Sequence, residues 1–211
     1  MTLPIALLSA TAALCAALTI VAKYRQSKRL EYVCKPLATA SILLIALLAA
    51  DPLTTRYQAL IVLGLAASLA GDVFLMLPDR FLPGLLSFLV AHLFYIAAFT
   101  LEGRGTAPLW YVAPFVLYGV LMLRWLWPHL GSLRGPVIVY LAVILLMAWQ
   151  AANRWIETRQ DGTLLALAGA YLFVTSDSVL AVERFRGAWR SAPFWVLSTY
   201  FVAQWLIALS V

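Results

Sequence analysis

Charged side chains are scarce in this sequence. Only 11% of its 211 residues are Asp, Glu, Lys or Arg, whereas 64% are hydrophobic, and the mean hydropathy is +0.92. A water-soluble domain carries roughly 25% charged residues and about 45–50% apolar ones. So large a deficit of charge excludes a soluble globular protein. The surplus of apolar surface requires lipid as its solvent.

Cysteine and histidine are nearly absent as well. The two cysteines are Cys15 and Cys34, and the two histidines are His92 and His129. No pair among them has the spacing of a zinc site, and the cysteines give no reason to expect a structural disulfide. The sequence therefore offers no motif for a metal ion or a cofactor.

Long apolar runs, in contrast, recur from one end of the chain to the other. A run of ~17–25 apolar residues crosses the bilayer core as one helix, and lipid leaves helices or a closed barrel as the options. Strict alternation of apolar and polar residues, which a barrel requires, does not occur. We predict an all-α polytopic membrane protein, a single domain over 1–211 with eight spans, the first of them retained rather than cleaved. The spans are expected at about 2–22, 35–50, 57–77, 81–99, 108–126, 133–152, 162–182 and 191–211.

The basic residues give an independent test of this count, because cytoplasmic loops carry an excess of Lys and Arg. Eleven of the fifteen basic residues fall in the first, third, fifth and seventh connections, and four fall on the other side. This bias predicts cytoplasmic odd-numbered connections and both termini outside, in a bacterial inner membrane. Contact with anionic lipid headgroups is enough to explain the net charge of +6, and no nucleic-acid partner is expected. The four on the outer side are Arg56, Arg104, Arg154 and Arg159.

Two carboxylates lie inside predicted spans, Asp72 in the third and Asp177 in the seventh. An Asp in the bilayer core costs at least ~2.5–3.5 kcal/mol on insertion scales, so each one requires a reason. Each lies about five residues before the cytoplasmic end of its span, roughly 7–8 Å deep at ~1.5 Å per residue. One interpretation is that each Asp caps a helix end or pairs with a nearby arginine such as Arg80 or Arg184. The other places both in one water-filled cavity, one carboxyl ionised and the other holding a proton, as an acid/base hydrolase requires.

Further polar side chains fall in the same half of the bilayer. His92 and Tyr95 share one helix face, and Tyr200 and Gln204 share another. Singly, each is typical of a hydrogen bond between helices, and together they favour a pocket. An offset of 105 residues also superposes Asp72 on Asp177, Tyr95 on Tyr200, and Lys35 on Tyr140.

Several of these residues belong to segments that resemble the YhhN-like lysoplasmalogenase family. The specific part is the central block, and spans five and six contribute little. The matching segments are Gly71-Asp72-Val73-Phe74-Leu75-Met76-Leu77, Gly84-Leu85-Leu86-Ser87-Phe88-Leu89, Ala91-His92-Leu93-Phe94-Tyr95, Lys35-Pro36, Gly169-Ala170-Tyr171-Leu172-Phe173, Ser176-Asp177, and Tyr200 with Gln204.

The resemblance implies an integral membrane hydrolase that cleaves the vinyl ether bond of a lysophospholipid, a lysoplasmalogen, in the membrane. Acid protonates the alkenyl carbon and water attacks the resulting cation, so one carboxylic acid and one carboxylate suffice. Asp72 and Asp177 would fill these roles, and which one is the acid stays open. Lys35 at the inner surface would attract the phosphate. The residues that would orient water and the glycerol hydroxyl are His92, Tyr95, Tyr140, Ser176, Tyr200 and Gln204.

Two other classes of function fit the same residues. Buried Asp and His also form proton relays in transporters, so a proton-coupled carrier of a small or lipid substrate is the main alternative. Helices broken by Gly or Pro at matched positions would favour it, and the third and seventh spans contain Gly71 and Gly169 but no proline. A purely structural membrane subunit is the third class, and two buried acids argue against it.

Overall fold

The computed structural model describes residues 2–50, 52–101 and 108–211. Within these ranges the chain is helical, without strands, and eight helical segments are long and apolar enough to cross a membrane. The prediction of an all-α polytopic bundle is confirmed. The helices are α1 (Leu3–Tyr24), α2 (Lys28–Leu47), α3 (Thr55–Met76), α4 (Phe81–Thr100), α5 (Ala113–Leu126), α6 (Arg134–Thr158), α7 (Asp161–Arg186) and α8 (Ala192–Leu209), with short 3₁₀ segments flanking α5.

The second predicted span was wrong at its start. Helix α2 begins at Lys28, seven residues before the predicted boundary, and continues through Pro36. Its first turn was missed because it is charged, and an ion pair of 2.6 Å between Lys23 and Glu31 now joins α1 to α2 there. Helices α6 and α7 also extend past their predicted ends, to Thr158 and Arg186.

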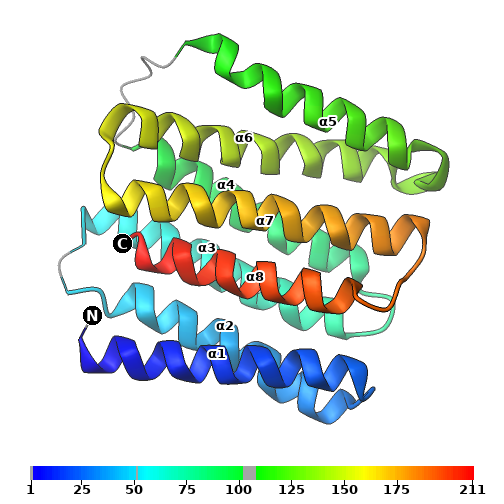
Figure 1. The fold of residues 1–211 in the computed structure, drawn as a ribbon, viewed down its shortest axis with the longest axis horizontal. Helices are drawn as coiled ribbons and strands as arrows, with labels where there is room; N and C mark the ends of the chain where they lie inside the picture. Colours follow the sequence, from blue (N-terminus) through cyan, green and yellow to red (C-terminus); the bar gives the residue numbers. More distant parts are fainter. Residues whose placement is uncertain (1, 51, 102–107) are drawn as a thin grey trace.

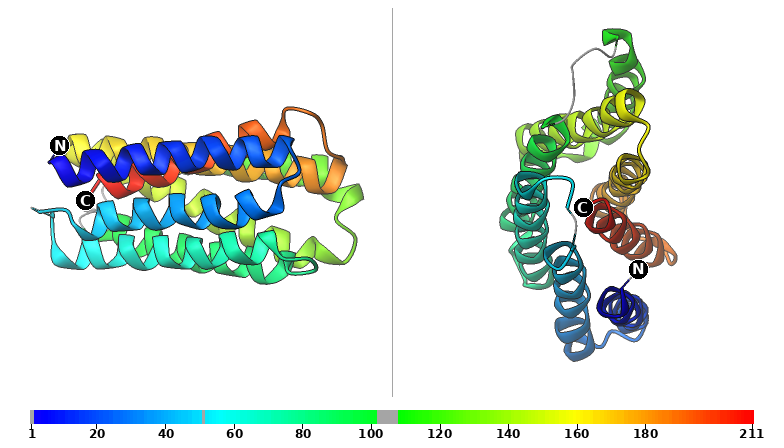
Figure 2. Two further views of the ribbon diagram at one scale, coloured as in Figure 1. Left: turned by 90° about the horizontal axis from the view of Figure 1, so that it is seen from below. Right: turned by 90° about the vertical axis from the view of Figure 1, so that its left-hand side faces the viewer.

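The eight helices form two layers (Figure 2). One layer contains α1, α8, α7 and α5 in that order, and the other contains α2, α3, α4 and α6. Contacts of α8 with α2 and of α6 with α7 join the layers. Helix α5 lies at the edge of the bundle, with Met122 and Leu126 as its buried side chains (Figure 1). The core between the layers therefore receives side chains from all helices, but least from α5.

Two antiparallel hairpins, α3–α4 and α7–α8, are held by small residues at seven-residue spacing. In the first hairpin, Cβ atoms at Gly64 and Gly71 would lie 2.3 and 2.7 Å from the rings of Tyr95 and Phe88. In the second, a Cβ at Gly169 would lie 2.8 Å from the backbone oxygen of Ala203. Close approach at small residues is the usual basis of helix packing in lipid, where burial alone provides no driving force.

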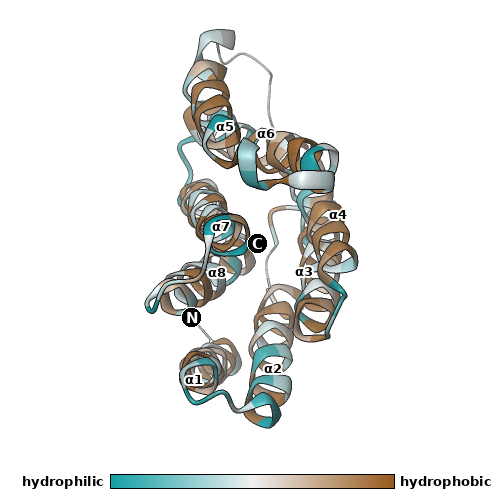
Figure 3. Ribbon diagram, turned by 90° about the vertical axis from the view of Figure 1, so that its right-hand side faces the viewer, coloured by the Kyte–Doolittle hydropathy of each residue, from teal (hydrophilic) through white to brown (hydrophobic). Residues whose placement is uncertain are grey.

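Both chain termini lie at the same end of the bundle (Figure 1). The opposite end carries the turns before α2, α4, α6 and α8, and polar residues gather there in the end-on view (Figure 3). This is the end that the basic residues predict to be cytoplasmic. Two of the four basic residues assigned to the other side are not seen in a loop there. Arg154 is buried within α6, with its guanidinium 4.2 Å from the centre of the Tyr57 ring, and Arg104 lies outside the described residues.

Candidate active site between the two helix layers

Asp72 is buried between the layers, with 1% of its surface exposed, and has three partners. Its Oδ2 atom accepts hydrogen bonds from the hydroxyls of Thr39 at 2.5 Å and Tyr200 at 2.7 Å. The Lys35 ammonium lies 3.2 Å from Oδ1. Asp72 is thus a buried carboxyl engaged by one ammonium and two hydroxyls.

Helical periodicity brings these partners together. Lys35 and Thr39 are one turn apart on α2 and reach Asp72 from the same layer, whereas Tyr200 reaches it from α8 in the other layer. One turn along α8, the Gln204 side-chain oxygen accepts a 2.8 Å hydrogen bond from Tyr95 of α4. Residues four apart on α2 and on α8 thus share a helix face and form one polar cluster. The cluster spans the α2–α3, α3–α8 and α4–α8 interfaces.

The cluster retains unused hydrogen-bonding capacity. Among the described residues, the Gln204 Nε2 atom and the hydroxyl of Ser68 have no partner, although both residues are completely buried. Ser68 lies one turn before Asp72 on α3. Buried polar atoms of this kind cost free energy unless a water or a ligand group bonds them.

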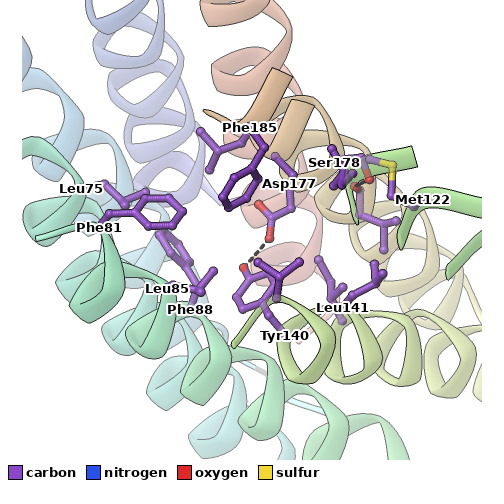
Figure 4. Close-up of a pocket in the computed structure, with 16 residues that line it drawn as sticks. Leu75, Phe81, Leu85, Phe88, Met122, Tyr140, Leu141, Asp177, Ser178 and Phe185 are labelled. Atoms are coloured by element: carbon purple, nitrogen blue, oxygen red, sulfur yellow. Dashed lines mark hydrogen bonds between the residues drawn. The ribbon is translucent and has the colours of Figure 1, made fainter. Parts of the chain in front are cut away.

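Asp177 lies in a different setting, at the wall of a cavity among α3, α4, α5, α6 and α7 (Figure 4). The hydroxyl of Tyr140 donates a short hydrogen bond to its Oδ2 atom. The cavity offers about 70 Å³ to water-sized molecules, room for roughly five waters at ~10–15 Å³ each or for one slender chain. Ser178 is the other polar residue of the wall, and the apolar ones include Leu75, Phe81, Leu85, Phe88, Met122, Leu141 and Phe185.

An aromatic cluster connects the surroundings of the two carboxylates. Phe88, a wall residue of the cavity, packs edge to face on Tyr200 at 5.8 Å, and Tyr200 in turn holds Asp72. Asp72 is not among the residues that line the cavity. Neither carboxylate forms an ion pair with Arg80 or Arg184 in the described part of the chain, so the predicted pairing with arginine is wrong. A water shared between the two carboxyls stays a prediction.

The depths of the two carboxylates also differ from the prediction when measured along their helices. Asp72 lies four residues before the end of α3, whereas Asp177 lies nine residues before the longer end of α7. Lys35 was expected at the inner surface, and that was wrong. It lies two turns inside α2, 7% exposed and engaged by Asp72, so it is not available to a lipid headgroup.

His92 is completely buried and packs edge to face against Phe173 at 4.7 Å and Tyr140 at 5.3 Å. Neither ring nitrogen has a partner among the described residues. Ser176, another predicted site residue, donates to the Val196 carbonyl of α8 at 2.9 Å and therefore fastens two helices. His92 thus packs against Tyr140, the hydrogen-bond donor to Asp177, and the Ser176 hydroxyl is used in a contact between α7 and α8.

Sequence reasoning missed Thr39 and Ser68. Each is one turn from a residue that was recognised, Lys35 or Asp72. That spacing was the available signal, but hydroxyls inside apolar helices usually bond their own backbone and so attract no notice. For metal binding, the residues that the structure describes bring no three His, Cys, Asp or Glu side chains together.

Comparison with known proteins places this geometry in a family. A model described as the YhhN family matches residues 30–211. The chain belongs to the YhhN family. The match covers α2 to α8 almost completely and includes both intramembrane carboxylates.

Relatives of the chain include bacterial and mammalian proteins. A membrane protein named YhhN from Escherichia coli O6:H1 is 30% identical over 196 residues, which are 92% of each chain. Lysoplasmalogenase TMEM86A of Homo sapiens is 36% identical over 177 residues, 77% of this chain and 68% of that protein. Lysoplasmalogenase TMEM86B of Homo sapiens is 35% identical over 156 residues, 73% of this chain and 64% of that protein. No solved structure matches the chain.

Proposed function

We propose that this protein is a membrane hydrolase that cleaves the vinyl ether bond of lysoplasmalogens. The products are a fatty aldehyde and a glycerophospho-ethanolamine or -choline. The observation that carries the proposal is Asp177, a carboxyl group with a single tyrosine donor on the wall of an apolar cavity. Relatives named lysoplasmalogenases support the choice of substrate.

The proposed reaction needs one proton donor and one water. Protonated Asp177 delivers its proton to the second carbon of the alkenyl chain, which leaves an oxocarbenium ion at the first carbon. Water adds to that carbon while the Asp177 carboxylate accepts a proton, and the hemiacetal collapses to the aldehyde and the free glycerol hydroxyl. General acid catalysis of this kind contributes typically 10²–10⁴-fold. Tyr140 holds the carboxyl in place for both proton transfers.

Asp72 has a different proposed role, because three partners engage its carboxyl and it does not line the cavity. Through Tyr200 it fixes Phe88, and so it fixes one wall of the cavity. Asp72 is thus a positioning residue, and Asp177 is the group that meets the substrate.

The direct test is incubation of the purified protein in detergent micelles with three lysolipids of equal chain length. These are the 1-alkenyl, 1-alkyl and 1-acyl glycerophosphoethanolamines, with aldehyde, alcohol and fatty acid assayed as products. Aldehyde from the alkenyl lipid alone is the expected result. Fatty acid from the acyl lipid would show an esterase instead, and the absence of any product would favour the carrier alternative.

We also propose that the end of the bundle opposite the termini faces the cytoplasm of a bacterial cell, which places the mouth of the cavity in the inner leaflet. Single cysteines at Ser132 and at Gln160 test this orientation, because both positions are exposed and lie at opposite ends of the bundle. A membrane-impermeant maleimide should label Gln160→Cys in intact cells and Ser132→Cys only after lysis. The opposite pattern would invert the topology.

A further inference from the structure

Three arginines at the predicted cytoplasmic end of the bundle each lie over an aromatic ring. The guanidinium carbons of Arg184, Arg134 and Arg186 are 4.8, 4.8 and 4.7 Å from the ring centroids of Phe81, Trp127 and Trp125. Such stacking fixes a guanidinium while leaving its N–H edge free for an anion.

Arg184 is the one nearest the cavity. Phe81, the ring beneath it, lines the cavity and meets Phe185, another wall residue, edge to face at 6.3 Å (Figure 4). Arg134 lies three residues before the wall residue Val137. Among the described residues, neither arginine forms an ion pair, and both side chains are exposed. At this end of the bundle, Arg184 thus lies directly behind a wall residue of the cavity, Arg134 begins the helix that supplies Val137, and neither forms an ion pair with a described residue.

Distance along α7 relates Arg184 to the proposed catalytic carboxyl. Arg184 follows Asp177 by seven residues, two turns on the same face of the helix, or roughly 10 Å at 1.5 Å per residue. In a lysoplasmalogen, six bonds join the first alkenyl carbon to the phosphorus atom, and they span roughly 7 Å when extended, since three backbone bonds span ~3.3–3.6 Å. The flexible arginine side chain bridges the difference.

We infer that Arg184, with Arg134, binds the phosphodiester of the lysolipid headgroup at the mouth of the cavity and so places the vinyl ether beside Asp177. The inference rests on the proposed function, and it replaces Lys35 as the source of positive charge. Phosphate pairs well with guanidinium because two parallel N–H groups match two of its oxygens. The headgroup then remains at the aqueous rim, outside the narrow apolar space.

The activity test compares two alkenyl substrates, 1-alkenyl-glycerophosphoethanolamine and 1-alkenylglycerol, which lacks the phosphate. Arg184→Gln should lower kcat/KM for the phospholipid about tenfold or more, since charge-assisted hydrogen bonds are lost. It should leave kcat/KM for the alkenylglycerol unchanged. Arg29→Gln is the matched control, an exposed arginine at the same end of the bundle but on α2, and it should alter neither value. Equal losses on both substrates, or no loss on either, would overturn the inference.

A binding measurement keeps the inference testable if the protein hydrolyses neither substrate. The wild type should be stabilised against heat more by a 1-alkyl-glycerophosphoethanolamine, which has no vinyl ether, than by the matching 1-alkylglycerol. Arg184→Gln should abolish that difference, and Arg29→Gln should retain it. Inorganic phosphate should not reproduce the stabilisation. If it does so at the same concentration, the rim is a general anion site and the headgroup assignment is wrong.

Discussion

The two intramembrane carboxylates have opposite surroundings. Asp72 is compensated by an ammonium and two hydroxyls and has no place in the wall of the cavity, whereas Asp177 has one phenol as its donor and faces apolar space. A buried charge with complete compensation stabilises one arrangement of helices, and a carboxyl with few donors in a cavity is suited to exchange a proton. A buried carboxyl can thus stabilise the packing of helices at one position and take part in the reaction at another.

The offset of 105 residues sharpens the comparison. It superposes Lys35, the partner of Asp72, on Tyr140, the partner of Asp177. The starts of α1 to α4, shifted by the same offset, fall within six residues of the starts of α5 to α8. Positions related by this offset thus hold an ion pair in one half of the chain and a phenol–carboxyl pair in the other.

The largest effect is expected at the cavity. Asp177→Asn keeps the shape of the side chain and can still accept from Tyr140, but an amide delivers no proton. Aldehyde release should fall at least ~100-fold, and the melting temperature in micelles should stay close to that of the wild type. Asp177→Glu should retain part of the activity. A folded Asp177→Asn protein that releases aldehyde at a near wild-type rate would remove Asp177 from the mechanism.

Stability should respond at the other carboxylate. Removal of one member of a buried ion pair leaves an uncompensated charge and costs about 3–5 kcal/mol. Asp72→Asn and Lys35→Met should each lower the free energy of unfolding in micelles by that amount. The double variant should lose less than the sum of the two, because no charge is left unpaired. Strictly additive losses would show that the two side chains do not interact as the structure has them.

A smaller effect is expected in the α7–α8 hairpin. Gly169→Ala places a methyl group 2.8 Å from the Ala203 oxygen, which is backbone and cannot rotate away. Overpacking of this kind costs typically 1–3 kcal/mol. Gly135→Ala is the matched control, because a Cβ there has nothing within 4 Å. The two variants should differ in thermal stability, and equal melting temperatures would contradict the close helix approach.

Much of the fold could be predicted from the sequence, because lipid imposes strong constraints on length and composition. The apolar runs predicted eight spans, and the basic bias predicted which turns share one end of the bundle. The start of α2 was not predicted, because Lys28 and Glu31 are charged and hydropathy assigns charged residues to a loop, although both lie in the helix. Arg154 was assigned to a connection for the same reason, although it is buried and stacked on an aromatic ring in the last turns of α6.

The site was predicted in its members but not in its connections. The free-energy cost of an Asp in the bilayer core singled out Asp72 and Asp177. Helical spacing placed His92 with Tyr95 on one helix face and Tyr200 with Gln204 on another. Which residue of another helix pairs with each carboxylate depends on rotation and depth, and no local pattern carries that information. Lys35 therefore looked like a surface charge, although it forms the buried ion pair with Asp72.

The central claim is that a carboxyl transfers a proton to an alkenyl carbon in this cavity. Aldehyde release by the wild-type protein from 1-alkenyl-glycerophosphoethanolamine, compared in H₂O and D₂O across the plateau of the pH profile, tests it most directly. Because proton transfer to carbon is the slow step of the proposed reaction, the rate should be lower in D₂O, and each aldehyde should carry one deuterium on the carbon beside its carbonyl. Equal rates in the two solvents, or aldehyde without deuterium at that carbon, would contradict the account.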